Sequence, residues 1–198
     1  MDTQFIVLAA RADRMTWRPS DRYGGGQFGV MMALPNETIA HAGVQVVLEN
    51  QKFWFNVDVS QAQMGKPAFN TTFEGMQNGN VSFLATGGRV RTSSTGKQSL
   101  RFGLSGFRIR STLAQAINRA VLDVRCVEIR DRWMKVSESY RIPKPKQGQS
   151  AFGERLLNVY LPGPMQIAPR QPVYIEGHMA ARSITGDQSM YVIADLVA

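Results

Sequence analysis

Apolar and polar residues alternate with a period of two along much of the chain, a pattern that predicts β-strands buried on one face. In QKFWFNVDV, residues 51–59, one face is apolar and the other carries Lys52, Trp54, Asn56 and Asp58. In RWMKVSESYRI, residues 132–142, the more polar face again carries a tryptophan and a lysine two positions apart, Trp133 and Lys135. Tryptophan normally lies on the apolar face of a sheet. Each of these two therefore needs a partner, either a ligand or a covering loop.

A polar motif, T-G-x-Q-S, occurs at residues 95–99 and again 90 residues later, at 185–189. Gly87 and Gly177 precede the two copies at the same spacing, and the hydrophobic classes around the motif agree. Each copy reads as a strand, a polar turn and a second strand, which predicts a β-hairpin. We infer a duplicated β unit, with domains at residues 1–111 and 112–198.

A helical spacing occurs in STLAQAINRAVLDV, residues 111–124, where Leu113, Ile117 and Val121 follow a capping serine or threonine. We expect a short helix there that connects the two units. The rest of the chain alternates or is rich in turn residues, so the predicted fold class is mostly β. Two small β units that each end in a long hairpin favour two tandem OB-folds, which are five-stranded Greek-key barrels.

The charge balance narrows the function. The 22.0 kDa chain has a net charge of +8 and a pI near 10.1, and both halves are basic. A basic protein attracts polyanions, of which nucleic acid is the commonest. Cys126 is the only cysteine, which favours a reducing cytoplasm, in a bacterial cell or a phage-infected host. No apolar run is long enough for a transmembrane helix, so we expect no membrane partner.

Residues 172–198, PVYIEGHMAARSITGDQSMYVIADLVA, resemble the last two strands of bacterial single-stranded DNA-binding proteins. KFWFNVDV resembles the third strand of that family, where a tryptophan before an alternating apolar run is usual, and QFIVLAARADRM resembles its first strand. Residues 79–102, GNVSFLATGGRVRTSSTGKQSLRF, are a looser version of the same last two strands, and the resemblance as a whole extends over about half of the chain. The usual member has one OB unit and an acidic-tipped tail, whereas this chain carries two units and stops after a strand. A tandem arrangement is more typical of phage or plasmid versions.

The resemblance implies non-sequence-specific binding of single-stranded DNA, in replication, recombination or repair, by aromatic stacking and a basic groove. It places Trp54 as a platform for a base, with Lys52 beside it for phosphate, and the face assignment gives Trp133 and Lys135 the same parts in the second unit. The barrel loops supply the remaining candidates: Arg89, Arg91, Lys97 and Arg101; Arg18, Arg22 and Tyr23; and Arg141, Lys144 and Lys146. No cofactor or metal is expected.

The sequence also bears on three alternative functions. Residues 91–98 are not a phosphate-binding loop, because Arg91 takes the first glycine position and Gln98 the hydroxyl position. An enzyme is disfavoured, because neither His41 nor His178 has a second ligand at metal-site spacing and no G-x-S-x-G elbow occurs.

A structural or adaptor module, such as a phage virion component, stays open. It would have Trp54 and Trp133 buried or in an apolar patch. RNA as the ligand and a homo-oligomer also stay open.

Overall fold

The computed structural model describes residues 3–20, 24–41, 44–49, 51–79, 81–92, 97–142, 147–148, 150–184 and 187–198. Strands dominate these residues, as the alternating pattern predicts. The N-terminal part holds β1 (Thr3–Arg11), β2 (Arg14–Pro19), β3 (Gly26–Ala33), β4 (Glu37–His41), β5 (Val44–Leu48), β6 (Lys52–Val59), α1 (Pro67–Asn78), β7 (Ser82–Thr92), β8 (Gln98–Gly103) and β9 (Phe107–Arg110). The C-terminal part holds β10 (Ile117–Arg130), β11 (Trp133–Arg141), β12 (Phe152–Tyr160), β13 (Pro172–Ile184) and β14 (Asp187–Val197).

The N-terminal strands close into a barrel, here called the first barrel. Its strands run in the order β2-β3-β6-β8-β7-β1, and β1 leads directly into β2, so these two act as one bent strand that closes the circuit. β6 and β8 pair in parallel, while the other neighbours pair antiparallel. The barrel interior is aromatic, because Phe28, Phe53, Phe55, Phe83, Phe102 and Phe107 are almost completely buried.

The C-terminal strands repeat the same circuit as the second barrel. Their order is β10-β11-β12-β14-β13, and β10 pairs with both β11 and β13 to close it. The parallel pair is again formed by the third and fifth strands, β12 and β14. The strand order of both circuits fits the OB-fold, so the predicted mostly β, OB-fold class is confirmed, and the two copies of the T-G-x-Q-S motif fall in the hairpins β7–β8 and β13–β14. That the two units are a tandem repeat stays a prediction. That residues 1–111 and 112–198 are separate folding domains stays a prediction.

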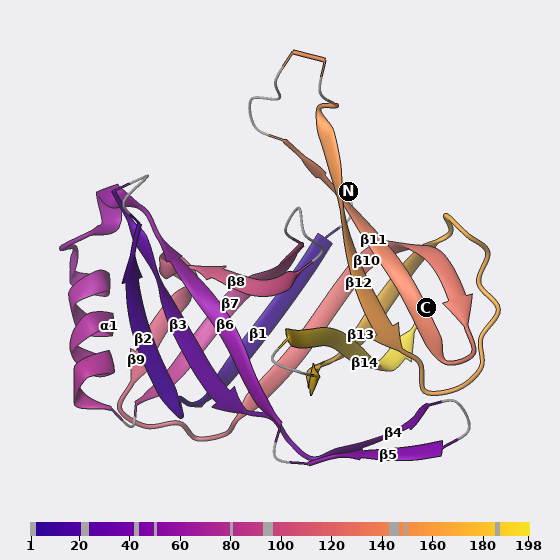
Figure 1. The fold of residues 1–198 in the computed structure, drawn as a ribbon, viewed down its shortest axis with the longest axis horizontal. Helices are drawn as coiled ribbons and strands as arrows, with labels where there is room; N and C mark the ends of the chain where they lie inside the picture. Colours follow the sequence, from indigo (N-terminus) through magenta and orange to yellow (C-terminus); the bar gives the residue numbers. More distant parts are fainter. Residues whose placement is uncertain are drawn as a thin grey trace.

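The two barrels share one sheet. β1 and β10, the first strand of each barrel, pair antiparallel over seven residue pairs, with Phe5 opposite Val121. The hydrogen-bonded path therefore runs without a break from β11 in the second barrel to β2 in the first. In Figure 1 the barrels stand side by side, joined along this pair.

The predicted connecting helix is wrong. Residues 117–124 of this segment form the beginning of β10, a 14-residue strand, and residues 111–116 before it are not helical. Ala120, Leu122, Val124 and Cys126 are buried with a period of two, and β1, β11 and β13 all pair with this strand. The tertiary pairing therefore overrides the weak helical spacing of Leu113, Ile117 and Val121.

The α-helix of the described residues lies elsewhere. α1 begins at Pro67, a favourable first helical residue, and connects the third and fourth strands of the first barrel. Its Phe69 ring lies 5.1 Å from Trp17 and 5.6 Å from Phe28, so the helix closes one end of the barrel core (Figure 1). The described part of the chain contains no helix long and apolar enough to cross a membrane.

A separate hairpin, β4–β5, leaves the first barrel between its second and third strands and extends beneath the second barrel (Figure 1). Its buried Ile39 and Leu48 pack into a small apolar cluster with residues of the second barrel, Tyr160, Ala180 and Tyr191. The hairpin therefore ties the first barrel to the outer surface of the second.

Candidate nucleic-acid interface

Trp54 lies on the outer face of the first barrel, as the alternation of β6 predicts. The residue is 38% exposed, while its neighbours Phe53 and Phe55 are buried. Trp54 is opposite Met31 on β3. A side chain at Gly29 would come within 3.4 Å of the indole ring and 2.8 Å of Thr16 Oγ1. The glycine therefore leaves room for the indole against the sheet, and part of the ring remains accessible.

Lys52 lies at the beginning of β6, on the same face as Trp54. Its Nζ is 3.9 Å from Asp13 Oδ2, and its side chain is largely exposed. An exposed ion pair of this length contributes little, so phosphate could replace the carboxylate at little cost.

Arginines on β7 and β8 extend this face across the barrel. Arg101 on β8 is in register with Asn56 on β6 and with Arg89 on β7. Arg91 lies two positions further along β7, opposite Ser99. Both β7 arginines are exposed, so the structure brings Arg89, Arg91 and Arg101 together with Trp54 on one outer surface. We call Lys52, Trp54, Arg89, Arg91 and Arg101 the basic face.

Asp58 places a carboxylate within the basic face, beside Arg101. Arg101 donates to Asp58 Oδ1 from Nη1 at 3.0 Å and to Ser99 Oγ from Nε at 3.3 Å. These bonds hold the guanidinium against the sheet. They also place a negative charge beside it, which weakens its field at a phosphate.

A hollow of about 580 Å³ opens at the end of the basic face nearest to Asp58. Arg18, Asp58 and Arg101 line it, together with Gly25, Gly26, Ser60 and Gln61. Arg18 is exposed and faces Gln27 across the β2–β3 pair. The predicted partners Arg22 and Tyr23 lie outside the described residues. Lys97, next to the hairpin turn of the first barrel, is exposed.

The second barrel places its tryptophan differently. Trp133 is half-buried, with edge-on contacts to Tyr160 at 5.2 Å and to Tyr191 at 5.1 Å between ring centroids. It packs against the apolar cluster that Ile39 and Leu48 of the β4–β5 hairpin complete. Trp133 is therefore partly covered, as expected for a tryptophan in an apolar patch, whereas Trp54 is 38% exposed.

Lys135 also differs from Lys52. It donates to Glu128 Oε1 at 3.0 Å, and Arg130 binds the other carboxylate oxygen at 3.0 Å. The hydrogen bond from Lys135, followed by the charges of Arg130 and Lys135, holds the pKa of Glu128 below its usual value. Lys135 therefore stands beside a carboxylate that stays ionised. Arg141 is exposed at the end of β11, while Lys144 and Lys146 lie outside the described residues.

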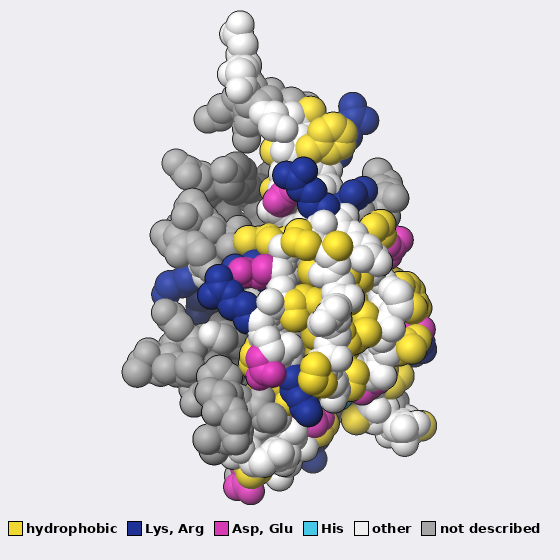
Figure 2. All heavy atoms as spheres, turned by 90° about the vertical axis from the view of Figure 1, so that its right-hand side faces the viewer, with side chains coloured by type: hydrophobic (Ala, Val, Ile, Leu, Met, Phe, Trp, Pro, Cys, Tyr) yellow, Lys and Arg dark blue, Asp and Glu magenta, His cyan; other side chains and the backbone are white. Residues whose placement is uncertain are grey.

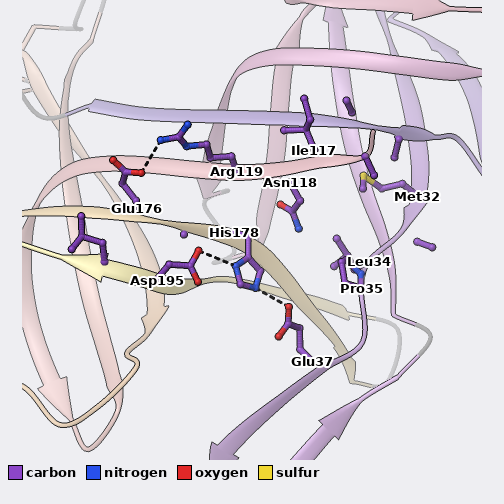
Figure 3. A pocket seen from close by; sticks show the side chains of 16 residues that line it. Met32, Leu34, Pro35, Glu37, Ile117, Asn118, Arg119, Glu176, His178 and Asp195 are labelled. Carbon is purple, nitrogen blue, oxygen red and sulfur yellow. Dashed lines mark hydrogen bonds and ion pairs between the residues drawn. The ribbon is translucent and has the colours of Figure 1, made fainter. Parts of the chain in front are cut away.

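A larger pocket, about 720 Å³, lies where the two barrels and the base of the β4–β5 hairpin meet (Figure 3). His178 projects between two carboxylates, with Nε2 2.8 Å from Glu37 and Nδ1 3.4 Å from Asp195. Beyond it, Arg119 donates to Glu176 at 2.7 Å. The hydrogen bond from Tyr174, and then the one from Arg119, hold the pKa of Glu176 below its usual value. Three carboxylates at the rim make this pocket unfavourable for phosphate.

Known structures resemble the whole chain. No family model and no curated protein sequence matches it. A crystal structure of a deletion mutant of the single-stranded DNA-binding protein from Thermus aquaticus matches with a TM-score of 0.61 and 11% identity, over 100% of this chain and 94% of the other. The wild-type protein matches with a TM-score of 0.59 and 9% identity, over 100% and 92%. The chain shares their fold. The resemblance found in the sequence is thus confirmed for the fold, and the match includes both barrels.

Proposed function

We propose that the chain binds single-stranded DNA without sequence specificity, through the basic face of the first barrel. The observation that carries this proposal is the half-exposed Trp54 on the same outer surface as Lys52, Arg89, Arg91 and Arg101. The fold shared with single-stranded DNA-binding proteins supports it. A duplex hides its bases from such a platform, whereas a single strand offers both unstacked bases and phosphates.

The basic face suits this ligand for two physical reasons. Stacking of a base on an exposed aromatic ring contributes on the order of 1–3 kcal/mol and tolerates any sequence, because every base has a π-face. Arginine and lysine neutralise phosphates and release counterions, which adds affinity that falls with salt. Arg18, at the hollow beside Arg101, extends the phosphate-binding surface, and the candidates Arg22 and Tyr23 follow it in the sequence.

The second barrel contributes less in this proposal. Trp133 is packed among tyrosines and Lys135 is paired with Glu128, so both lie in a less favourable setting than their counterparts. Arg141 at the end of β11, and Lys144 and Lys146, which follow it in the sequence, are the second barrel's candidates for phosphate. We also propose a role in replication, recombination or repair, a phage or plasmid origin, a cytoplasmic location and a homo-oligomer. RNA is the alternative ligand for the same basic face.

A structural or adaptor role is the second candidate. The observation that favours it is the apolar setting of Trp133, which is what such a module would show. Exposed apolar residues on the outer side of the shared sheet, Phe5, Ile117 and Leu196, would suit protein contacts.

Fluorescence anisotropy separates these two functions. A labelled oligo-dT of about thirty bases, enough to span several stacking sites, is titrated with the protein, and unlabelled duplex of equal length serves as competitor. We expect tight binding that the duplex does not displace. Absence of binding at low salt would reject the proposal and leave the adaptor role.

A further inference from the structure

We propose that Phe152 on β12 is a second base-stacking platform, and that a bound strand reaches it from the basic face across the contact between β8 and β12. This inference rests on the proposed function and extends it to a surface of the second barrel. No sequence pattern had singled out Phe152, because it lies at the end of a strand next to a polar turn.

The exposure of Phe152 is the first observation. Among the exposed large hydrophobic side chains of the described residues it has the highest value, 62%. A single exposed phenylalanine is not unusual by itself. Its position gives it meaning, because it lies directly opposite Arg141 in the β11–β12 register, and Arg141 is exposed as well. An aromatic ring beside a guanidinium is the combination that binds a base together with its phosphate.

The strand order provides the second observation. β12 is the third strand of its barrel, as β6 is of the first, because each pairs in parallel with the fifth strand. Phe152 lies on the same side of β12 as Leu156 and Tyr160, the outer side, since successive residues alternate. Each barrel thus presents one exposed aromatic ring on the outer side of its third strand, Trp54 in the first barrel and Phe152 in the second.

Side-chain contacts stabilise the β11–β12 hairpin on the side opposite to Phe152. Arg155 donates to Glu138 at 3.0 Å, and both side chains are largely buried. The same guanidinium lies 3.9 Å from the centre of the Tyr140 ring. These contacts support the strands that carry Arg141 and Phe152. Figure 2 shows hydrophobic and Lys or Arg side chains together on the projecting upper part of the second barrel.

A direct contact connects this hairpin to the basic face. The Gln98 side chain, at the beginning of β8, donates to the Leu156 carbonyl oxygen at 2.9 Å. β8 also carries Ser99 and Arg101. The basic face therefore borders β12 near Leu156. From Leu156 to Phe152 the strand advances four residues, about 13 Å. Glu154 is exposed between them, and it is the charge that a strand on this path must pass.

The test compares Phe152→Ala with wild type on two oligo-dT lengths, about ten and about thirty bases, by anisotropy at low salt. We expect roughly tenfold weaker binding of the long oligonucleotide, since one stacked base is lost, and unchanged binding of the short one, which the first barrel holds. Phe152→Trp should retain the affinity for the long oligonucleotide, and Glu154→Gln should increase it. Tyr174→Ala is the matched control, because Tyr174 is an exposed ring that donates to Glu176.

Each other outcome identifies which claim fails. If Phe152→Ala binds the long oligonucleotide like wild type while Trp54→Ala binds it weakly, the inference is overturned and the proposed function stands. If Phe152→Ala weakens the binding of both oligonucleotides equally, the proposed path of the DNA from the basic face to Phe152 is overturned. If wild type binds neither oligonucleotide, the proposed function and this inference both fail. Phe152 is exposed, so circular dichroism should show the same fold for every variant.

Discussion

At the scale of residues, the two tryptophans on polar strand faces have different surroundings. Trp54 packs over a glycine on an arginine-rich surface, whereas Trp133 is half-buried against two tyrosines in the cluster that the β4–β5 hairpin completes. The alternation of each strand predicts correctly that both rings lie on the outside. It could not predict their different exposure, because Trp133 packs against a cluster whose members Ile39 and Leu48 are distant from it in the sequence.

Replacement of Trp133 tests its structural role. Trp133→Ala removes the ring that contacts Tyr160 and Tyr191, so we expect a loss of about 2–3 kcal/mol in the free energy of unfolding, somewhat below the cost for a fully buried aromatic residue. Urea unfolding followed by circular dichroism measures it. An unchanged unfolding midpoint would show that the cluster is not packed as described.

The carboxylate beside Arg101 provides a test in the opposite direction. Asp58→Asn removes the negative charge 3.0 Å from Arg101 Nη1, so the affinity for oligo-dT should rise, roughly threefold. Asp123→Asn, which removes an exposed carboxylate from the outer side of β10, is the matched control. Weaker binding by Asp58→Asn would mean that the carboxylate positions Arg101 for the ligand instead of competing with it.

At the scale of elements, the strands were more predictable than the helices. The period-two alternation over 51–59 corresponds to β6, and the repeated motif marks two real hairpins. The helix expected over 111–124 is a strand, because burial between β1 and β13 decides that segment. α1 went unpredicted, although Pro67 followed by Phe69 and Phe73 at helical spacing indicates it in retrospect.

The β4–β5 hairpin is the element that makes the barrels unequal. The hairpin covers the outer surface of the second barrel around Tyr160, Ala180 and Tyr191. The corresponding surface of the first barrel is the exposed basic face. Leu48→Ser would bury a hydroxyl in this cluster, so we expect faster amide hydrogen exchange at residues 44–48 and at Tyr191. Val47→Ser is the control, because Val47 is exposed. Equal exchange in both variants would contradict the docking of the hairpin.

At the scale of the whole molecule, the continuous sheet through β1 and β10 fixes the two barrels relative to each other. A net charge of +8 is spread over both, so the field of the molecule attracts a polyanion, while the pocket between the barrels is rimmed by carboxylates. The two barrels therefore differ on their outer surfaces: the first carries the basic face, and the second is covered by the β4–β5 hairpin.

Salt dependence tests this electrostatic account. Between four and six arginine and lysine contacts to phosphate would give a slope of roughly −3 to −4 for the logarithm of the binding constant against that of the salt concentration. Anisotropy titrations at several salt concentrations measure the slope. A slope near zero would contradict binding by a basic face.

The dissociation constant of Trp54→Ala for oligo-dT tests the central claim most directly. Wild type, Trp54→Phe and the control Tyr174→Ala are measured beside it, with circular dichroism to compare their folds. The account predicts roughly tenfold weaker binding for Trp54→Ala, near-normal binding for Trp54→Phe and no change for Tyr174→Ala. Wild-type affinity in a folded Trp54→Ala protein would show that the basic face is not where single-stranded DNA binds.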